Sequence, residues 1–185
     1  MKRLLSASSL FVVAILITAL KPSPTQSTNY RHLGDSLSLK AQQALISNLL
    51  GAIEKGGAAY AVDFCHENAS PLTNSVSSQV KIQRVSTRNR NPDNAATIFD
   101  KKILDTFESN TPLKDTLVAI PKGYVYYKPI RIGMPTCLQC HGQPKKDIET
   151  ATAKTIQKKY RFDKATGYQI GQLRGAWKLT FLVDK

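Results

Sequence analysis

The run PTCLQCHG at 135–142 constrains this chain more than any other part of it. It holds two of the three cysteines, Cys137 and Cys140, and His141 follows them directly. Cys-x-x-Cys-His is the attachment signature of a c-type haem, because two thiols form thioethers with the porphyrin and the adjacent imidazole ligates the iron. We therefore expect one haem c per chain, with His141 as the proximal axial ligand. The motif leaves the distal side of the iron unassigned.

Two other roles for these cysteines stay open. A structural zinc site needs four protein ligands, and beyond the motif the chain offers only Cys65, His66 and His32. A redox-active disulfide of the Cys-x-x-Cys type normally opens a helix after a strand in a βαβ pattern, which this sequence lacks. The histidine that follows the motif cysteines, together with an N-terminal export signal, favours haem over both alternatives.

The N-terminus has the pattern of a targeting segment. Lys2 and Arg3 precede an apolar run at 4–20 that carries no charge. Such a run predicts a signal peptide or an N-terminal membrane anchor over 1–20, and cleavage stays undecided. We expect an extracytoplasmic protein, in the periplasm or the thylakoid lumen, that is soluble after cleavage or held to the membrane by this segment. Covalent haem is also assembled outside the cytoplasm.

The chain is strongly basic, with 26 Lys and Arg against 13 Asp and Glu and a formal charge of +13. Such an excess suits an anionic membrane face, an acidic protein or the haem propionates. No basic helix interleaved with aromatic residues and no nucleic-acid-binding motif is present, so we do not expect a nucleic-acid partner.

The remaining pattern predicts one α+β domain over 35–185, preceded by a Pro/Ser/Thr-rich tether over 21–34. Apolar residues recur near a helical period from Asp35, and Gly56 and Gly57 interrupt that helix. Strands and helices are mixed in the rest of the chain, and we expect most of the strands to be antiparallel. They comprise a resumed helix at 58–69, a strand at 81–87, a loop at 88–97, a helix at 98–109, a hairpin at 116–132, a helix at 147–159 and a strand at 174–183.

Four stretches together resemble the extracytoplasmic c-type haem domain with a PAS-like fold, known from cyanobacteria and bacterial sensor proteins and long described as a domain of unknown function. They are AAYAVDFCHENASP at 58–71, RVSTRNRNPDN at 84–94, VYYKPIRIGMPTCLQCHG at 125–142 and KYRFDKATGYQIGQLRGAW at 159–177. The resemblance implies a central antiparallel sheet, with N-terminal and flanking helices that enclose the haem. It also implies axial ligation by His141 and Cys65. Ser70 departs from the family pattern, because it separates an Ala and a Pro that are adjacent there.

The residues themselves rank the candidates for the distal ligand. Cys65 has apolar neighbours, whereas His66 is the alternative and lies about 100° away on the same helix, so at most one of them can face the iron. A bulge at Ser70 would favour His66. Met134 is attached to the same side of the haem as the motif, and ordering His32 in the tether costs entropy. A vacant or water-bound distal site also stays open.

Two haem propionates need cationic or solvated surroundings. Arginine fits a carboxylate better than lysine, because its guanidinium can donate two parallel hydrogen bonds. The candidates flank the expected pocket, although each could equally be an ordinary surface charge; they are Arg84, Arg88, Arg90 and Arg131, with Lys128 as a weaker one.

Three classes of function fit a haem in this setting. A thiolate from Cys65 favours ferric iron and a low reduction potential, and its loss on reduction would let CO or NO bind. This favours a redox or gas sensor whose state an unknown redox or signalling protein reads, since this sequence has no output domain. The alternative is an extracytoplasmic electron-transfer cytochrome. A haem enzyme ranks last, because it needs an open iron site and an acid–base residue.

Overall fold

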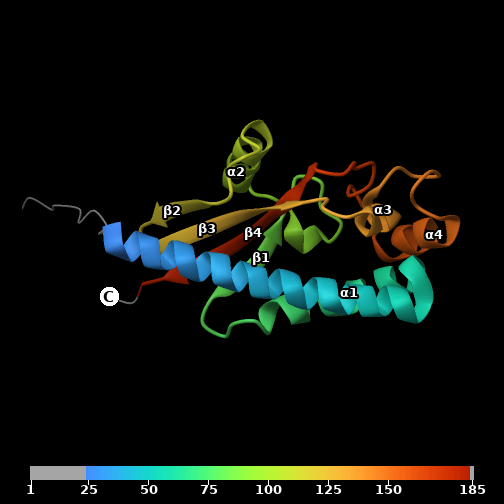
Figure 1. The fold of residues 1–185 in the computed structure, drawn as a ribbon, viewed down its shortest axis with the longest axis horizontal. Helices are drawn as coiled ribbons and strands as arrows, with labels where there is room; N and C mark the ends of the chain where they lie inside the picture. Colours follow the sequence, from blue (N-terminus) through green and yellow to red (C-terminus); the bar gives the residue numbers. More distant parts are fainter. Residues whose placement is uncertain (1–23, 184–185) are drawn as a thin grey trace, which may run out of the picture.

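A four-stranded antiparallel sheet forms the centre of the protein, in a computed structural model that describes residues 24–183. The strand order is β1-β4-β3-β2, and helices lie on both faces of the sheet (Figure 1). The strands are β1 (Lys81–Val85), β2 (Thr116–Ile120), β3 (Gly123–Arg131) and β4 (Leu173–Leu182). The predicted α+β class is confirmed, as is the hairpin of β2 and β3, which pair from Thr116 with Tyr127 to Ile120 with Gly123.

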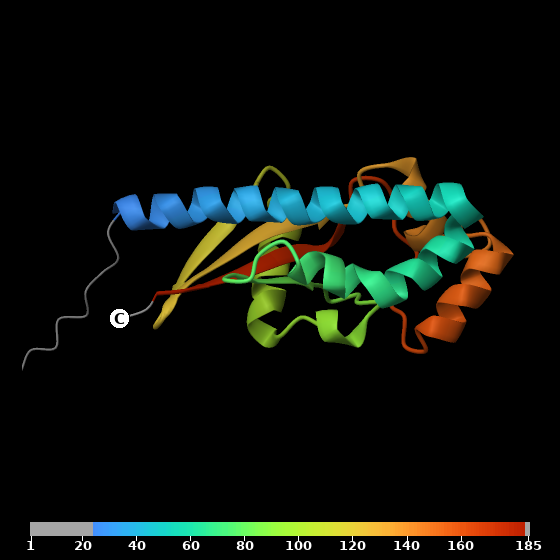
Figure 2. The same ribbon diagram turned by 90° about the horizontal axis from the view of Figure 1, so that it is seen from below.

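Helix α1 (Pro24–Asn74) is long and bent in its middle. Its backbone leaves helical geometry only at Gly56 and Gly57, and the φ of 74° at Gly57 lies in the left-handed region that favours glycine. The first part of α1 crosses one face of the sheet, and the part after the bend turns back beside the sheet end (Figure 2). The predicted interruption at this glycine pair is therefore present.

The predicted tether is wrong for residues 24–34, which form the first turns of α1. Tyr30 packs with its ring centroid 4.8 Å from that of Tyr124 and 5.2 Å from that of Phe181. A Cβ on Gly34 would come within 2.4 Å of the Tyr126 ring, so the helix backbone lies directly on the sheet. Packing against aromatic residues orders a segment whose composition alone is typical of a linker. Residues 21–23, like the signal or anchor segment at 1–20, lie outside the described residues.

The two faces of the sheet bury different clusters, because side chains alternate along each strand. On the α1 face the cluster includes Tyr124, Tyr126 and Trp177, with Leu37 and Ala41 from α1. The opposite face packs on α2 (Ile98–Ser109) through a second cluster, made of Val85, Leu104, Phe107, Val125, Tyr127 and Ala176. The bounds of α2 are the ones that the sequence predicts.

Asp100 joins α2 to the sheet and is almost fully buried, with 1% of its surface exposed. It completes a capping box with Thr97 at the start of α2. One of its carboxylate oxygens accepts from the Tyr127 hydroxyl at 2.7 Å and lies 2.8 Å from the Lys178 ammonium. This buried carboxylate fixes the helix on its face of the sheet.

Helices α3 (Pro135–His141) and α4 (Thr150–Lys159) lie beyond the end of the sheet where β3 ends and β4 begins (Figure 1). The short helix η1 (Pro92–Asn94) follows β1 and contacts it. Helix α4 packs on the second part of α1, and this arrangement brings the Cys-x-x-Cys-His run close to the part of α1 that carries Cys65. Within residues 24–183, no helix is both long enough and apolar enough to span a membrane.

Candidate functional site

Helix α3 presents the motif cysteines on one face. Cys137 and Cys140 are three residues apart in a single helical stretch, so both point to the same side. Cys137 packs against Ile132, Ala165 and Tyr168, whereas Cys140 packs against an apolar cluster of Val62, Ile148 and Ile156. Burial raises the pKa of the Cys140 thiol to about 11. The two thiols therefore lie on one side of α3, and each packs against apolar side chains.

The His141 imidazole is fixed in orientation by the segment that precedes β4. Its Nδ1 lies 2.7 Å from the Ala165 carbonyl oxygen, and its own carbonyl accepts from the Tyr168 N–H at 2.9 Å. When Nδ1–H donates to a carbonyl, Nε2 keeps its lone pair for a metal. Burial lowers the pKa of His141 well below its usual value, and nearby arginine charges act in the same direction. His141 is therefore held neutral, in the form that ligates iron.

Gly142 follows the histidine because the chain folds back tightly there. A Cβ at this position would lie 2.5 Å from the Asp147 Cβ and 2.6 Å from the Leu138 carbonyl oxygen. The Asp147 carboxylate closes the turn by accepting from the Gln143 N–H at 2.7 Å. The glycine thus lets α3 end directly after its histidine.

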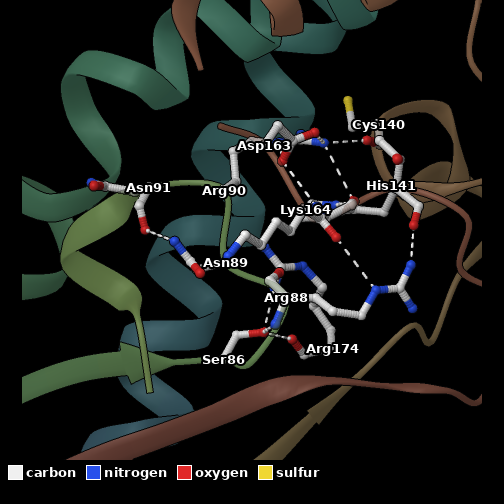
Figure 3. A network of polar contacts seen from close by, with 12 residues as sticks. Ser86, Arg88, Asn89, Arg90, Asn91, Cys140, His141, Asp163, Lys164 and Arg174 are labelled. Carbon is white, nitrogen blue, oxygen red and sulfur yellow. Dashed lines mark hydrogen bonds and ion pairs between the residues drawn. The ribbon is translucent and has the colours of Figure 1, made fainter. Parts of the chain in front are cut away.

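Arg90 holds the motif against the segment before β4. Its guanidinium donates to both carboxylate oxygens of Asp163, at 3.1 and 3.2 Å, and to the Cys140 carbonyl at 2.6 Å (Figure 3). A longer contact of 3.4 Å reaches the Ala165 carbonyl, which His141 also contacts. The side chains of Arg90 and Asp163 are only 11% and 9% exposed. Arg90 is therefore already paired with a carboxylate, and the predicted propionate role has no support from its contacts.

Arg88 and Arg131, also predicted propionate partners, bind backbone carbonyls. Arg88 donates to the carbonyls of Thr166 and Lys164 and stacks 3.8 Å from the centroid of the Tyr168 ring. The two Arg131 contacts are to the carbonyls of Phe107, at 2.7 Å, and Gly171, at 3.2 Å. The first of these lies near the end of α2, so the structure does not bring Arg131 to the motif.

Arg84 and Arg174 also place positive charges near His141, and neither forms an ion pair with a carboxylate among residues 24–183. Arg84 lies on β1, and burial lowers its pKa. Its charge in turn lowers the pKa of the Cys65 thiol. Arg174 is the second residue of β4 and donates through Nη1 to the Ser86 hydroxyl and the Arg88 carbonyl, both at 3.1 Å. Burial lowers the pKa of Arg174 to about 10, so it stays cationic at neutral pH.

The sequence analysis missed Arg174. It lies in a stretch that carries the family resemblance, but it stands at the start of an apolar strand among turn residues. Only the pairing of β4 with β1 and the turn of the chain at 86–88 bring its guanidinium beside the motif. The chain distance between Arg174 and Ser86 hides this contact from sequence reasoning.

Cys65 faces the motif, and His66 does not. The Cys65 thiol is half-buried and close enough to Cys140 to raise the pKa of that thiol, after the larger effect of burial. Burial raises the pKa of Cys65 itself, while the charges of Arg84 and Arg90 lower it. His66 is exposed, and its ring packs edge-on against Tyr160 with centroids 4.9 Å apart.

Helix α1 has no bulge at Ser70. In the described part of α1, only Gly56 and Gly57 leave helical geometry, so the helix continues through Ser70 and Pro71. The Thr73 hydroxyl donates to the Ala69 carbonyl at 2.8 Å across this turn. The inserted serine therefore does not rotate Cys65 away from the motif.

The remaining candidates lie elsewhere. His32 is exposed on the first turns of α1, at the opposite end of the sheet from α3 (Figure 1). Met134 is the residue that precedes α3, and Lys128 pairs with Asp35 of α1. Among residues 24–183, no three His, Cys, Asp or Glu side chains gather as a metal site of protein ligands would require, so the zinc alternative has no support.

The residues present fit a covalently held haem. Two thiols share one helix face, and a neutral imidazole keeps Nε2 available. A third thiol, that of Cys65, is half-buried and lies near the Cys140 thiol. A buried Arg174 Nε has no hydrogen-bond partner among the described residues, so a cationic donor is available for an acidic group of the cofactor.

Known proteins agree with this architecture. A solved structure described as "Crystal structure of the cyanobacterial heme-protein Tll0287" matches with a TM-score of 0.60 and 23% sequence identity. The match covers 87% of this chain and 97% of that one, which shows a shared fold. No curated protein matches the sequence. The model of the family described as "Tll0287-like: Tll0287" matches residues 19–181, and this chain therefore belongs to the Tll0287-like family.

Proposed function

We propose that this protein is a c-type haem protein that senses redox state or a small gas, with His141 and Cys65 as axial ligands. The observation that carries the proposal is the position of Cys65 beside Cys140, within reach of the charges of Arg84 and Arg90, which also act on His141. The similar solved protein is itself called a heme-protein.

Cys137 and Cys140 would form the two thioethers, so one haem c would be carried by each chain. When bound, the haem supplies a one-electron couple and an iron that can take an exogenous ligand. The protein's part is to hold His141 neutral, with Nδ1 directed to the Ala165 carbonyl and Nε2 directed away from it. Arg90 and Asp163 keep that carbonyl in place.

The environment of Cys65 favours a ligand that leaves on reduction. Burial raises the pKa of this thiol, so its neutral form is the stable one when no strong positive charge is near. A thiolate is therefore held best by ferric iron, which gives a low reduction potential. With haem bound, reduction would lower the positive charge at the iron, the Cys65 thiolate would take up a proton from solvent and leave as the neutral thiol, and a position for CO or NO would become free.

The electron-carrier alternative rests on the charge of the chain. The excess of 26 basic over 13 acidic residues suits docking to an acidic redox protein or an anionic membrane face. We assign no enzymatic activity, because Cys65 would occupy the distal position. We place the protein outside the cytoplasm, in the periplasm or thylakoid lumen, with an unknown redox or signalling protein as its partner.

An optical redox titration of the exported, haem-loaded protein, with CO added at each potential, tests the sensor proposal. We expect a six-coordinate ferric spectrum and a reduced protein that binds CO. A six-coordinate spectrum that persists on reduction and does not respond to CO would favour the electron carrier. Haem that extracts freely into acidic organic solvent would overturn the c-type assignment itself.

A further inference from the structure

A cavity of about 260 Å³ lies between α2 and the strand ends that flank the motif. Arg88, Tyr168 and Arg174 line it from the motif side, and Asp105 and Glu108 line it from α2. Pockets for drug-sized ligands start at about 300 Å³. This cavity therefore suits a small molecule or one end of a larger one.

Part of the Arg174 guanidinium has no hydrogen-bond partner among residues 24–183. Both of its hydrogen bonds to described residues come from Nη1, which donates to Ser86 and to the Arg88 carbonyl (Figure 3). Although part of the side chain is accessible, its Nε is buried and has no partner among residues 24–183. A buried charged donor without an acceptor is unusual in folded proteins. The edge formed by Nε and Nη2 is one of those with which arginine binds a carboxylate through two parallel bonds.

We propose that the Nε/Nη2 edge of Arg174 is a carboxylate-binding site at this cavity. Arg174 differs here from its neighbours, because Arg90 already pairs with Asp163 and Arg88 already donates to two backbone carbonyls. Ser86 and Arg88 hold Nη1 and so fix the plane of the guanidinium. The fold thus orients the guanidinium, and a carboxylate reaches the buried Nε when the side chains that cover it move aside.

The carboxylate has two possible sources, a haem propionate and a small free carboxylate. The charge of Arg174 acts on His141, so the guanidinium lies near enough to the motif for a propionate to reach it. For a free ligand, the Asp105 and Glu108 carboxylates of α2 disfavour a second negative charge. Such a ligand carries a single carboxylate, and a cationic amine at its other end would be favoured. Only the propionate source rests on the proposed function.

Occupation of this site has a consequence for the iron. A carboxylate at Arg174 neutralises a positive charge next to the axial histidine, which favours ferric over ferrous iron and lowers the reduction potential. A free ligand at this cavity would therefore act on the same equilibrium as the redox signal. This gives the cavity a regulatory role that Cys65 and His141 alone do not provide.

The test uses the haem-loaded full chain and three variants. Arg174→Gln removes the charge and the paired donors, Arg174→Lys keeps the charge alone, and Arg161→Gln removes an exposed arginine as the matched control. Each protein is titrated calorimetrically with acetate, glycine and succinate, and its reduction potential is measured from pH 5 to pH 9. Haem retention in acidic organic solvent is checked first, so that failure of the haem assignment is recognised separately.

A free-ligand site predicts saturable binding of glycine, tighter than that of succinate. Loss of two charge-assisted hydrogen bonds in Arg174→Gln and Arg174→Lys should weaken this binding by about tenfold or more, and Arg161→Gln should not change it. This binding is measurable whether or not haem is attached. It would identify the small carboxylate as the occupant.

A propionate site predicts that none of the three probes binds. The potential of Arg174→Gln should then differ from that of Arg161→Gln, and its pH dependence should shift, because the propionate has lost its partner. No saturable binding, together with a potential and pH profile equal to those of Arg161→Gln, would overturn the proposal. If neither Arg174 variant folds, the ¹⁵N resonance of Arg174 Nε in the wild type decides, because a resonance equal to that of exposed Arg161 would also overturn it.

Discussion

The Nδ1 atom of His141 lies 2.7 Å from the Ala165 carbonyl oxygen, and Arg90 donates to the same oxygen at 3.4 Å. Asp163 completes this arrangement, since it binds the Arg90 guanidinium and accepts from the Ala165 N–H at 3.0 Å. The orientation of the imidazole therefore depends on residues that are far from it in sequence. The site is built by a loop, an arginine and the motif together.

Replacement of Cys65 separates the two candidates for the distal ligand. We expect Cys65→Ser to keep both thioethers but to lose the low-spin ferric signal with the narrow g-anisotropy of thiolate ligation. Its potential should rise, because an anionic donor to ferric iron is removed. Electron paramagnetic resonance and a redox titration measure both effects. His66→Ala is the matched control and should change neither, since His66 packs on Tyr160; a high-spin His66→Ala with an unchanged Cys65→Ser would instead indicate bis-histidine ligation.

Replacement of Arg90 should loosen the motif without removing a ligand. Arg90→Gln leaves Asp163 nearly buried without its cation, which costs on the order of 3 kcal/mol of unfolding free energy. Urea unfolding measures this loss. Asp163→Asn combined with Arg90→Gln should cost less than the sum of the single changes, because the two side chains form one interaction. Additive losses would show that the pair does not act as a unit.

Asp100 should make the stability depend on pH in the acidic range. Burial opposes its charge, but hydrogen bonds from Lys178, Tyr127 and Thr97 hold its pKa below the usual 3.8. A lowered pKa contributes stability that is present above the unfolded value and is lost as the pH falls through the folded value. Asp100→Asn should therefore cost about 2 kcal/mol at pH 7, and its difference from the wild type should shrink below about pH 4.

Urea unfolding between pH 3 and pH 7 measures this difference. Asp105→Asn is the control on the same helix, because its pair with Lys101 is solvent-exposed and worth at most about 1 kcal/mol. A gap between wild type and Asp100→Asn that stays constant with pH would contradict the assignment.

Gly142→Ala should impair the turn after the haem motif. The new Cβ would lie 2.5 Å from the Asp147 side chain and 2.6 Å from the Leu138 carbonyl oxygen, so the backbone has to move. We expect a lower melting temperature and a smaller fraction of chains with covalent haem, measured by thermal unfolding and by pyridine haemochrome. Gly51→Ala is the control in α1, where nothing lies within 4 Å of the added Cβ, and it should stabilise by up to about 1 kcal/mol. Equal effects at both positions would contradict the steric argument.

The sequence predicts the elements that depend on local patterns. The bounds of α2, the interruption at Gly56 and Gly57 and the β2–β3 hairpin follow from periodicity and turn residues. The helical start of α1 could not be predicted, because its order comes from Tyr30 and Gly34 packing on a sheet formed much later in the chain. Tertiary contacts override composition in that segment.

The candidate site likewise contains residues that the sequence predicts and residues that it does not. Cys137, Cys140 and His141 are readable because their spacing is local. The arginines are not, since a guanidinium finds its partner in three dimensions. Arg90 and Arg131 have their partners within the protein. Arg174 has a buried Nε with no acceptor among residues 24–183, which the sequence of its strand does not predict.

The glycine pair Gly56 and Gly57 divides α1 into two helical parts. Residues 24–55 form a straight helical part roughly 48 Å long, at about 1.5 Å of rise per residue. Tyr30 and Leu37 pack this part on the sheet. Cys65 lies on the shorter helical part, which begins after Gly57. The helix changes direction there, because Gly56 leaves helical geometry and Gly57 adopts a φ of 74°. In the proposed switch, release of the Cys65 thiol would move this short helical part, and the part of α1 that packs on the sheet would stay in place.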